Sequence, residues 1–449
     1  MEKNILICLE KMGAGGVETF VLTQAMELKR RGFKVYVMSK YGEYVESLQE
    51  NDIEWIEESF DLRNEFDFNK SLKIYKLLKE KNIGQVHIHQ FPCVLSVWCA
   101  CAIAQIPYVT YLHSGTDVIY NWYEYNYTIY KQFFREFFNN AEKIVAISKG
   151  AKNSNKNYYN IPEEKYIILN NSINLELFKP TKQIEKIKKF MIISRMSKEK
   201  VKSIKNAIDF FIKYSEKNPK DNYILDIYGD GSEKDEVRKY VEEQNTNGYE
   251  INMLNSTNEV KKVMDEHDVV MAVGRCVLEA IAMHRIAIIS GNAGDEPLKY
   301  IVKPENIIES IENNFAYKDL KKENIENIIY DLSNYSQEDL KEIVETNYRT
   351  IQEKLDIKNN IYVVETTDGE KESSSNILKI IIQIEQDKRL QIEKENKRYK
   401  AEIEEIREEI KQIQENNRNL KEELDKVYNS KRWKYIDKIT KPLKNNRKP

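Results

Sequence analysis

The sequence predicts an α/β protein with two doubly wound domains, each a parallel sheet covered by helices on both faces. Short apolar runs alternate with helical stretches through roughly the first 330 residues. Most of these runs are continuously apolar, as expected for parallel strands buried on both faces. The alternation restarts after residues 171–190, a stretch with Pro180 and no clear periodicity. Such a restart indicates a second domain of the same class.

The strand predictions follow the apolar runs. In the first domain they lie at residues 4–9, 34–38, 53–56, 85–89, 107–112 and 143–148. In the second they lie at residues 189–194, 222–228, 249–254, 268–273 and 285–290. A helical pattern at 335–357 closes the second domain, so we expect domains at residues 1–178 and 179–360. The longest apolar run, 93–106, is shorter than the ~20 residues that span a membrane and is predicted to be a buried helix.

A polar stretch at residues 361–376 is predicted to be a linker, and residues 377–428 a long helix that pairs as a coiled coil. One heptad register places seven apolar residues at a and d positions: Ile403, Ile406, Ile410, Ile413, Leu420, Leu424 and Val427. Asn396 and Asn417 fall at a positions, which favours a parallel homodimer. A solvated helix, or one that folds back on the globular part, is the alternative.

The segment 429–449 is basic, with one acid, Asp437. Its eight basic residues are Lys431, Arg432, Lys434, Lys438, Lys441, Lys444, Arg447 and Lys448. Four apolar residues are spaced to share a helix face: Trp433, Ile436, Ile439 and Leu443. A basic amphipathic segment of this kind can lie on an anionic membrane surface. A solvated tail that balances the acidic helix before it is the alternative.

Composition excludes several classes of protein. The chain has 70 basic and 73 acidic residues, a balance that does not favour nucleic acid as a partner. Its five cysteines have no metal-ligand spacing and are typical of reduced cysteines in a cytoplasmic protein. The amino terminus is expected to be a strand rather than a signal peptide. There is also no P-loop, no GxSxG motif and no evident carboxylate pair for hydrolysis.

Residues 189–200, KFMIISRMSKEK, bring two permanent cations to the end of a predicted buried strand. Arg195 follows Ser194 at the end of the apolar run, and Lys200 comes five residues later. Ligands of open α/β sheets bind at the carboxyl ends of the strands. The planar fork of Arg and the point charge of Lys together suit a diphosphate. Two ordinary surface cations are the alternative in a chain this rich in lysine.

The first predicted strand runs into a glycine-rich turn, KMGAGGVETF, at residues 11–20. Gly13, Gly15 and Gly16 permit a tight turn, and the amino terminus of the following helix suits an anion. A dinucleotide site would need GxGxxG spacing and an acid after the second strand. The chain has Ser39 and Lys40 at that place, so dinucleotide binding is not favoured.

Three further loops follow predicted strands. His113, with Ser114 and Gly115, is placed to bond a substrate hydroxyl, although a structural histidine is as plausible there. Residues 227–234, IYGDGSEK, form a glycine turn that lets a ligand approach the backbone. Residues 268–283 join a strand to a helix whose first turns contain Glu279. An acid at this place can also serve the helix dipole alone.

Taken together, these segments resemble family 4 glycosyltransferases, nucleotide-sugar enzymes of the GT-B fold, in which two Rossmann-like domains face each other across a cleft. The resemblance covers roughly residues 4–350. It rests on six segments in the family's order: GAGGVE, the His113 turn, AISKG with NYYNIPEEKYIILNNSINLELFKP, SRMSKEK, YGDG and GRCVLEAIAM.

The resemblance implies a role for individual residues. Arg195 and Lys200 are expected to bind the donor diphosphate, and Glu279 the donor ribose. His113 is expected to contact the transferred sugar. Further donor-binding residues are expected to be Gly15, Gly16, Ser194, Gly229, Asp230, Gly231, Gly274 and Arg275.

The chain departs from the family pattern at a few places. Many relatives carry two Glu separated by seven residues in the last motif, and Met271 stands at the first of these positions. A GR-x-x-x-E form is kept by Gly274, Arg275 and Glu279. His284 replaces the small residue usual after this helix. Ser172 and Asn174 replace the more usual Gly and Asp between the domains.

The resemblance implies a retaining glycosyltransferase that moves a sugar from a nucleotide diphosphate sugar to a glycan, lipid-linked or other acceptor, with no cofactor and no required metal. The ending NSKRWKYIDKITKPLKN is similar to tails that follow coiled coils in bacterial polysaccharide glycosyltransferases. We therefore expect a role in bacterial cell-surface polysaccharide or glycoconjugate synthesis, on the inner face of the plasma membrane. A catalytically inert GT-B scaffold that acts through its coiled coil is the alternative.

Overall fold

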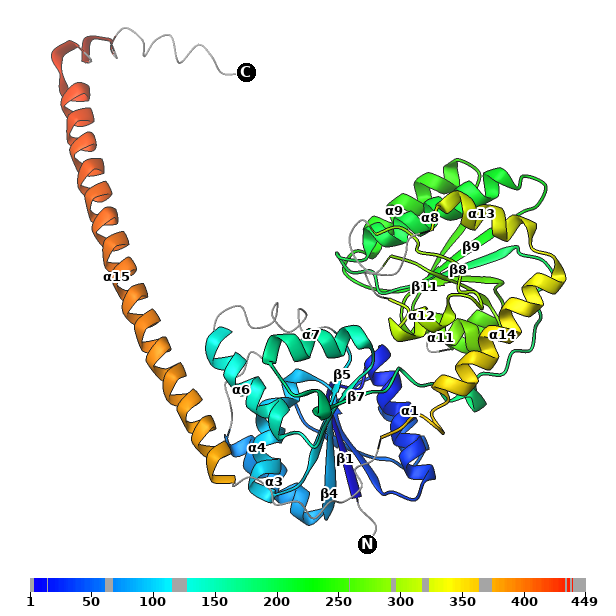
Figure 1. Ribbon diagram of the computed structural model, residues 1–449. Coiled ribbons are helices and arrows are strands. Elements are labelled where there is room, and N and C mark those ends of the chain that lie inside the picture. The colour runs from blue at the N-terminus through cyan, green and yellow to red at the C-terminus, as the bar shows by residue number, and fades with distance from the viewer. Residues whose placement is uncertain are drawn as a thin grey trace. The chain divides into compact units, whose positions relative to one another are not determined.

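The computed structural model describes residues 4–13, 15–60, 68–114, 127–257, 259–291, 296–316, 323–362, 374–432, 434–436 and 438. The chain divides into two units, Met1–Ile380 and Ile381–Pro449. The first unit contains two parallel β-sheets with their helices, which we call the first and second lobes (Figure 1). The second unit is formed, in its described part, mainly by one long helix.

The first lobe is built on a seven-stranded sheet in the order β3-β2-β1-β4-β5-β6-β7, in which neighbouring strands are parallel. Its strands are β1 (Asn4–Lys11), β2 (Val35–Lys40), β3 (Glu54–Glu57), β4 (Ile83–Ile88), β5 (Tyr108–Leu112), β6 (Lys143–Ala146) and β7 (Tyr166–Ile168). The six predicted strands are confirmed. The sequence did not predict β7, because this edge strand has only three residues and none of them is fully buried.

Helices cover both faces of the first sheet (Figure 1). They are α1 (Gly16–Arg30), α2 (Val45–Glu50), α3 (Phe68–Glu80), α4 (Val94–Ala104), α6 (Tyr127–Asn140) and α7 (Lys149–Tyr159). In α1, Val21, Ala25 and Leu28 recur at helical spacing and pack in one core with β1 and β2. The predicted buried helix is α4. Among the described residues, no helix is long and apolar enough to cross a membrane.

The second lobe is built on a five-stranded parallel sheet in the order β10-β9-β8-β11-β12. Its strands are β8 (Lys189–Ile193), β9 (Ile224–Tyr228), β10 (Glu250–Leu254), β11 (Val269–Ala272) and β12 (Ile286–Ile289). All five were predicted. Met271, at the departure from the family pattern, is completely buried in β11 within the apolar core beneath α8 and α13.

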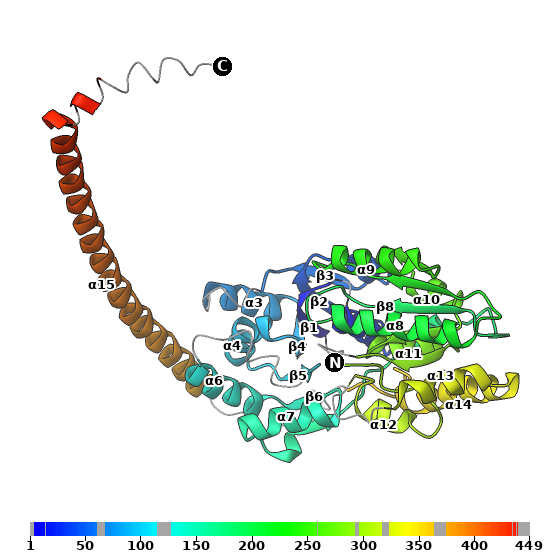
Figure 2. The same cartoon turned by 90° about the horizontal axis from the view of Figure 1, so that it is seen from above.

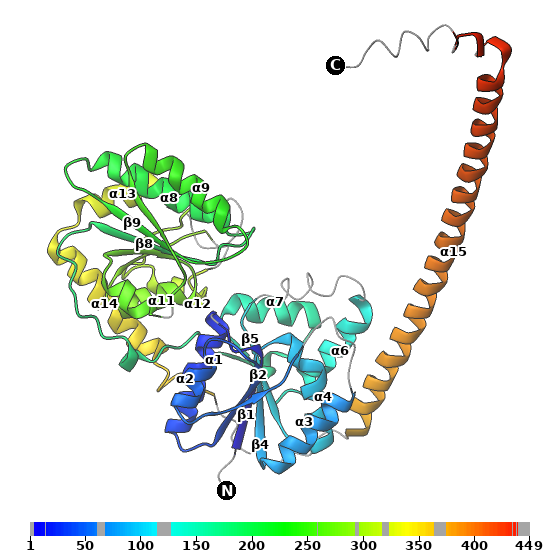
Figure 3. The ribbon, with the colours of Figure 1, turned by 180° about the vertical axis from the view of Figure 1, so that it is seen from behind.

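The helices of the second lobe also lie on both faces of its sheet (Figure 3). One face carries α8 (Val201–Lys217), α9 (Lys234–Thr246) and α13 (Ile325–Asn334). The other carries α10 (Val260–Asp265), α11 (Arg275–Ala282), α12 (Ile307–Glu312) and much of α14 (Gln337–Leu355). His284 lies just after α11 with φ of 54°, in the left-handed region that favours glycine. This backbone conformation explains why glycine, the smallest residue, would suit the position.

After α14 the chain returns to the first lobe. Ile173, in the segment that first joins the lobes, donates its N–H to Leu355 and accepts from the N–H of Ile357, at 2.9 and 3.0 Å. Ile361 then packs against the core beneath α1. The two crossing segments are therefore hydrogen-bonded to each other. Residues 363–373 of the predicted linker lie outside the described residues.

The predicted long helix is confirmed as α15 (Ser374–Asn429), which has 56 residues and runs continuously (Figure 2). Each apolar a and d residue from Ile403 to Val427 is about half exposed in the single chain. Most of the basic tail, including Trp433, Asp437 and residues 439–449, lies outside the described residues.

Candidate active site

The cationic loop follows β8, as predicted, and runs into α8. The Arg195 side chain is 74% exposed, with Nη2 3.3 Å from Glu199 Oε1. Lys200 is half-buried immediately before α8, and burial together with the nearby Arg195 charge lowers its pKa. An anion bound beside these two cations would raise the pKa of Lys200 again, because it favours the charged form of the amine.

The glycine turn after β9 packs directly against this loop. Met196 donates its N–H to the carbonyl of Asp230 at 2.8 Å. A Cβ atom on Gly229 would lie 2.0 Å from the Ser194 carbonyl oxygen, and one on Gly231, which has φ of 151°, would lie 2.3 Å from that of Met196. Both positions therefore require glycine for backbone packing. The predicted donor-binding glycines hold the cationic loop in place, whether or not they also contact a ligand.

The start of α11 holds a buried ion pair. Arg275 Nε lies 3.0 Å from Glu279 Oε1, and both side chains are about nine-tenths buried or more. Gly274, the residue before the helix, has φ of 60°. Burial raises the pKa of Glu279, an effect that the charge of Arg275 opposes. The neighbouring Cys276 thiol has its pKa raised to about 12 by burial, and Lys200 is close enough to oppose this rise.

The beginning of α1 meets the beginning of α11. A Cβ atom on Gly16 would lie 3.9 Å from the Cβ of Arg275, which is an ordinary contact. The same arginine donates from Nη1 to the Ser172 carbonyl at 2.9 Å and from Nη2 to Thr23 Oγ1 at 3.4 Å. Gly15 is the N-cap of α1 with extended backbone. The structure thus brings Gly15 and Gly16 to Arg275 and its ion-pair partner.

Two first-lobe residues near this meeting point were not predicted. The Tyr44 hydroxyl lies 3.5 Å from Thr19 Oγ1, and its pKa is raised by burial, with Glu279 and Arg275 among its charged neighbours. Glu18 accepts a hydrogen bond from Gln90 Nε2 at 3.3 Å, and burial raises its pKa. The acid in GAGGVE was a visible signal for Glu18. Nothing in the sequence brings Tyr44 next to the second lobe.

His113 follows β5, as predicted, and its ring is half-buried. Burial lowers its pKa to about 4, so the ring is neutral at pH 7. Its Nε2 lies 3.0 Å from Nδ1 of His89, which follows β4, and its ring centroid lies 5.5 Å from that of Phe20 in α1. His89 was not predicted, although QVHIHQ and VTYLHS both end apolar runs in histidine. Gly115 of the predicted turn lies outside the described residues.

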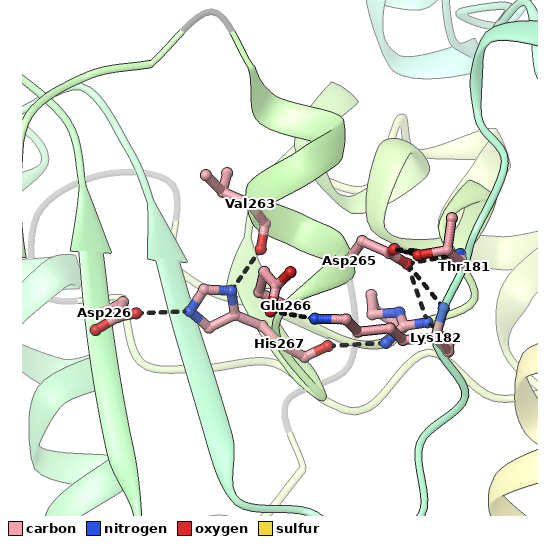
Figure 4. Close-up of polar contacts among 8 residues, drawn as sticks. Thr181, Lys182, Asp226, Val263, Asp265, Glu266 and His267 are labelled. Atoms are coloured by element: carbon pink, nitrogen blue, oxygen red, sulfur yellow. Dashed lines mark hydrogen bonds and ion pairs between the residues drawn. The ribbon is translucent and has the colours of Figure 1, made fainter.

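A second polar cluster lies by the segments that precede β8 and β11 (Figure 4). His267 contacts Asp226 Oδ2 through Nε2 at 3.0 Å and the Val263 carbonyl through Nδ1 at 2.6 Å. Asp265 accepts from the backbone N–H of Thr181 at 3.1 Å. The cluster joins chain segments of one lobe and is structural. Among the described residues, no group of three or more His, Cys, Asp or Glu could hold a metal ion.

Comparison with known proteins gives a family match for the first lobe and a fold for most of the chain. Residues 14–177, within the first lobe, match the model of Glycosyltransferase Family 4. The structure of a glycosyltransferase from Rickettsia africae ESF-5 superposes with a TM-score of 0.61 at 19% identity, covering 86% of this chain and 99% of that one. The family match covers the first lobe, and the likeness of fold covers most of the chain.

Two further structures have the same fold as this chain. Anabaena Alr3699/HepE, in complex with UDP and glucose, gives a TM-score of 0.59 at 15% identity, over 80% of this chain and 96% of that one. Sucrose-phosphate synthase from Thermosynechococcus elongatus gives 0.55 at 12% identity, over 87% and 99%. These likenesses confirm the predicted GT-B fold. No curated protein matches the chain.

Proposed function

We propose that the chain is a retaining glycosyltransferase that moves a sugar from a nucleoside diphosphate sugar to a glycan, lipid-linked or other acceptor. The observation that carries the proposal is the convergence of Lys200, the start of α11 and the start of α1. Each lies at the carboxyl end of a parallel strand, where ligands of open α/β sheets bind. The UDP and glucose bound by the Anabaena protein of similar fold support a nucleoside diphosphate donor.

The proposed chemistry breaks the bond between the anomeric carbon and the diphosphate oxygen. The bond electrons leave with the diphosphate, which gains negative charge. The acceptor oxygen bonds to the same face of the anomeric carbon, and its proton leaves with the diphosphate. Arg195, Lys200 and the positive end of the α1 dipole would stabilise the growing charge. These groups supply the positive field, so the proposal gives no metal a role.

In this proposal the donor ribose contacts Glu279. The Arg275 guanidinium already holds one carboxylate oxygen at 3.0 Å, which fixes the direction of the acid. A carboxylate has two oxygens, so one can accept from Arg275 while the other accepts a hydrogen bond from a ribose hydroxyl. Met271 has no part in the site, because it is buried in the core on the α8 side of the sheet.

We further propose an acceptor in bacterial cell-surface polysaccharide or glycoconjugate synthesis, reached at the inner face of the membrane. The support is the similarity of the ending to tails of polysaccharide glycosyltransferases, together with five cysteines that form no disulfide. Anionic vesicles should co-sediment the full chain but not a chain that lacks residues 429–449. Equal sedimentation of both chains would remove the membrane from the proposal.

The proposed partner of α15 is a second copy of this chain in a parallel coiled coil. The charged residues beside the apolar a and d positions of α15 support this partner. With Ile403 and Ile410 at a, the g positions are Glu395, Glu402, Glu409, Asn416 and Glu423. The e positions are Lys400, Arg407, Gln414, Lys421 and Tyr428. A parallel dimer places each g residue beside the e residue five positions later in the partner.

That pairing contains no contact between like charges. Glu395 meets the partner's Lys400, and Glu402 meets the partner's Arg407. An antiparallel dimer would instead pair g with g and e with e, which brings glutamates together and cations together. The asparagines at a positions 396 and 417 would also meet their own copies only in the parallel, in-register arrangement. The charge pattern therefore favours one orientation and one register.

A nucleotide and nucleotide-sugar screen tests the enzymatic proposal, with thermal shift and turnover as readouts. We expect Arg195→Ala and Lys200→Ala each to lower turnover by tenfold or more, because each removes a charge from the leaving group. Lys198→Ala is the matched control, since it removes an exposed cation from the same loop. Binding of no nucleotide, or activity that survives both substitutions, would instead support the inert scaffold.

A further inference from the structure

Two histidines end neighbouring strands of the first sheet. His89 follows β4 and His113 follows β5, and these strands pair in parallel. Nδ1 of His89 lies 3.0 Å from Nε2 of His113, and the two rings stack at 28° with centroids 5.3 Å apart. One ring nitrogen of His113 is therefore engaged inside the protein. Only Nδ1 remains for a ligand.

The ring of His89 is fixed by its surroundings. It is 2% exposed and stacks on Tyr111 at 4.1 Å and 11°. Phe20 packs against it, tilted at 48°, with a centroid distance of 5.8 Å. The backbone N–H of His89 donates to the Cys8 carbonyl of β1 at 3.0 Å. His89 is thus a rigid partner for the less buried His113.

The position of the shared proton follows from what surrounds His89. Burial keeps both rings neutral at pH 7, so each carries one N–H. Nε2 of His89 is buried and has no hydrogen-bond partner among the described residues. If His113 donated to His89, the single N–H of His89 would be stranded at this nitrogen. Buried N–H groups without a partner are rare, because the donor loses its hydrogen bond to water and gains none in the protein. If His89 donates instead, only a lone pair is left without a partner.

We propose that His89 is a positioning residue that donates from Nδ1 to Nε2 of His113. His113 then carries its own proton on Nδ1 and offers this N–H to an oxygen of the bound sugar. Among the described residues, Nδ1 of His113 has no hydrogen-bond partner, so its donor is available to a ligand. The inference rests on the proposed function, in which His113 contacts the transferred sugar.

Nitrogen NMR of the uniformly ¹⁵N-labelled full chain, without ligand, tests the proton positions directly. The chain has five histidines, and the variants His113→Gln and His89→Phe assign the two resonances. At pH 7.5 we expect the proton of each of the two rings on Nδ1. In His89→Phe, which keeps a ring on Tyr111 but removes the donor, His113 should lose its single tautomer. A proton on Nε2 of His113, or an unchanged tautomer in His89→Phe, would overturn the proposal.

Kinetics with a nucleotide sugar from the screen test the positioning role. We expect His89→Phe to lower kcat about tenfold with the donor KM within twofold, as for one lost orienting hydrogen bond. His89→Asn can donate from its amide near the former Nδ1 and should recover most of kcat. Equal losses in both variants would show that the hydrogen bond has no such role. Absence of turnover in the unchanged chain would count against the proposed function alone, because the NMR result does not depend on it.

Discussion

Arg275 and Glu279, one helical turn apart at the start of α11, form a buried ion pair with 3.0 Å between Nε and Oε1. The same guanidinium donates to the Ser172 carbonyl and to Thr23 of α1. One side chain therefore holds the proposed ribose-binding acid, the segment between the lobes and the first lobe. The position of Glu279 therefore depends on the contacts that Arg275 makes with the segment between the lobes and with the first lobe.

We expect Arg275→Met to lower the free energy of unfolding by about 3 kcal/mol at pH 7.5, because it leaves a carboxylate buried without a partner. The loss should be smaller at pH 5.5. Burial already raises the pKa of Glu279, and without Arg275 it rises further, so the acid takes up a proton as pH falls.

Urea unfolding at the two pH values measures these losses. Arg238→Met is the control, because Arg238 pairs at the surface with Asp235, whose side chain is 85% exposed. Its substitution should change stability by less than about 1 kcal/mol. An Arg275→Met loss no larger than this would contradict a structural role for the buried pair.

Gly229→Ala should separate the cationic loop from the turn after β9. The added methyl would lie 2.0 Å from the Ser194 carbonyl oxygen, so backbone must move. We expect a stability loss of about 1–3 kcal/mol and weaker binding of the nucleotide found by the screen. Gly16→Ala is the comparison, since its methyl meets Arg275 at an ordinary 3.9 Å. Thermal unfolding of Gly16→Ala should match the unchanged chain, and equal losses in both variants would contradict this difference.

Stability should fall as pH drops below about 6.5, in part because of His87. This ring is completely buried, and burial lowers its pKa to about 3. Between these values the unfolded chain binds a proton that the folded chain does not, so stability is lost by about 1.4 kcal/mol per pH unit for this residue. Guanidinium unfolding from pH 7.5 to 5 should show a shallower slope for His87→Gln. An equal slope in both chains would contradict a contribution of His87 to this loss of stability.

Reversing two charges beside the apolar a and d positions of α15 should weaken the pairing of two chains. Glu395→Lys with Glu402→Lys places cations opposite Lys400 and Arg407 of a second copy. Self-association should weaken at least tenfold, because four contacts change from attraction to repulsion, each worth about 0.2–1 kcal/mol. Light scattering after size exclusion measures this change. Mixing with a chain that carries Lys400→Glu and Arg407→Glu should restore the dimer, whereas failure to restore it would contradict the parallel arrangement.

Most of the fold could be predicted because strands buried on both faces leave continuous apolar runs in the sequence. All eleven predicted strands are present, at places such as 189–194 and 285–290. The exception, β7, lies at the sheet edge and buries too little apolar surface to leave such a run. The long helix α15 was equally clear, since its heptads span many turns.

The site could be predicted less completely, because its contacts depend on packing between distant segments. The spacing of Arg275 and Glu279 permits an ion pair, but their burial against Thr23 and Ser172 depends on the second lobe meeting α1. The glycines at 229 and 231 were interpreted as an approach for ligand, whereas they also admit the backbone of a neighbouring loop. His89 was overlooked because only strand order makes it a neighbour of His113.

The paired crossing segments at Ile173 and Ile357 restrict how the lobes can move. A single connection would act as a swivel with several free directions. Two connections that hydrogen-bond to each other should bend about one axis more easily than they twist. Arg275 donates to the Ser172 carbonyl beside these paired segments, so bending there would move Arg275 and, through it, the carboxylate of Glu279. A change in the angle between the lobes would therefore shift the carboxylate that is proposed to bind the donor ribose.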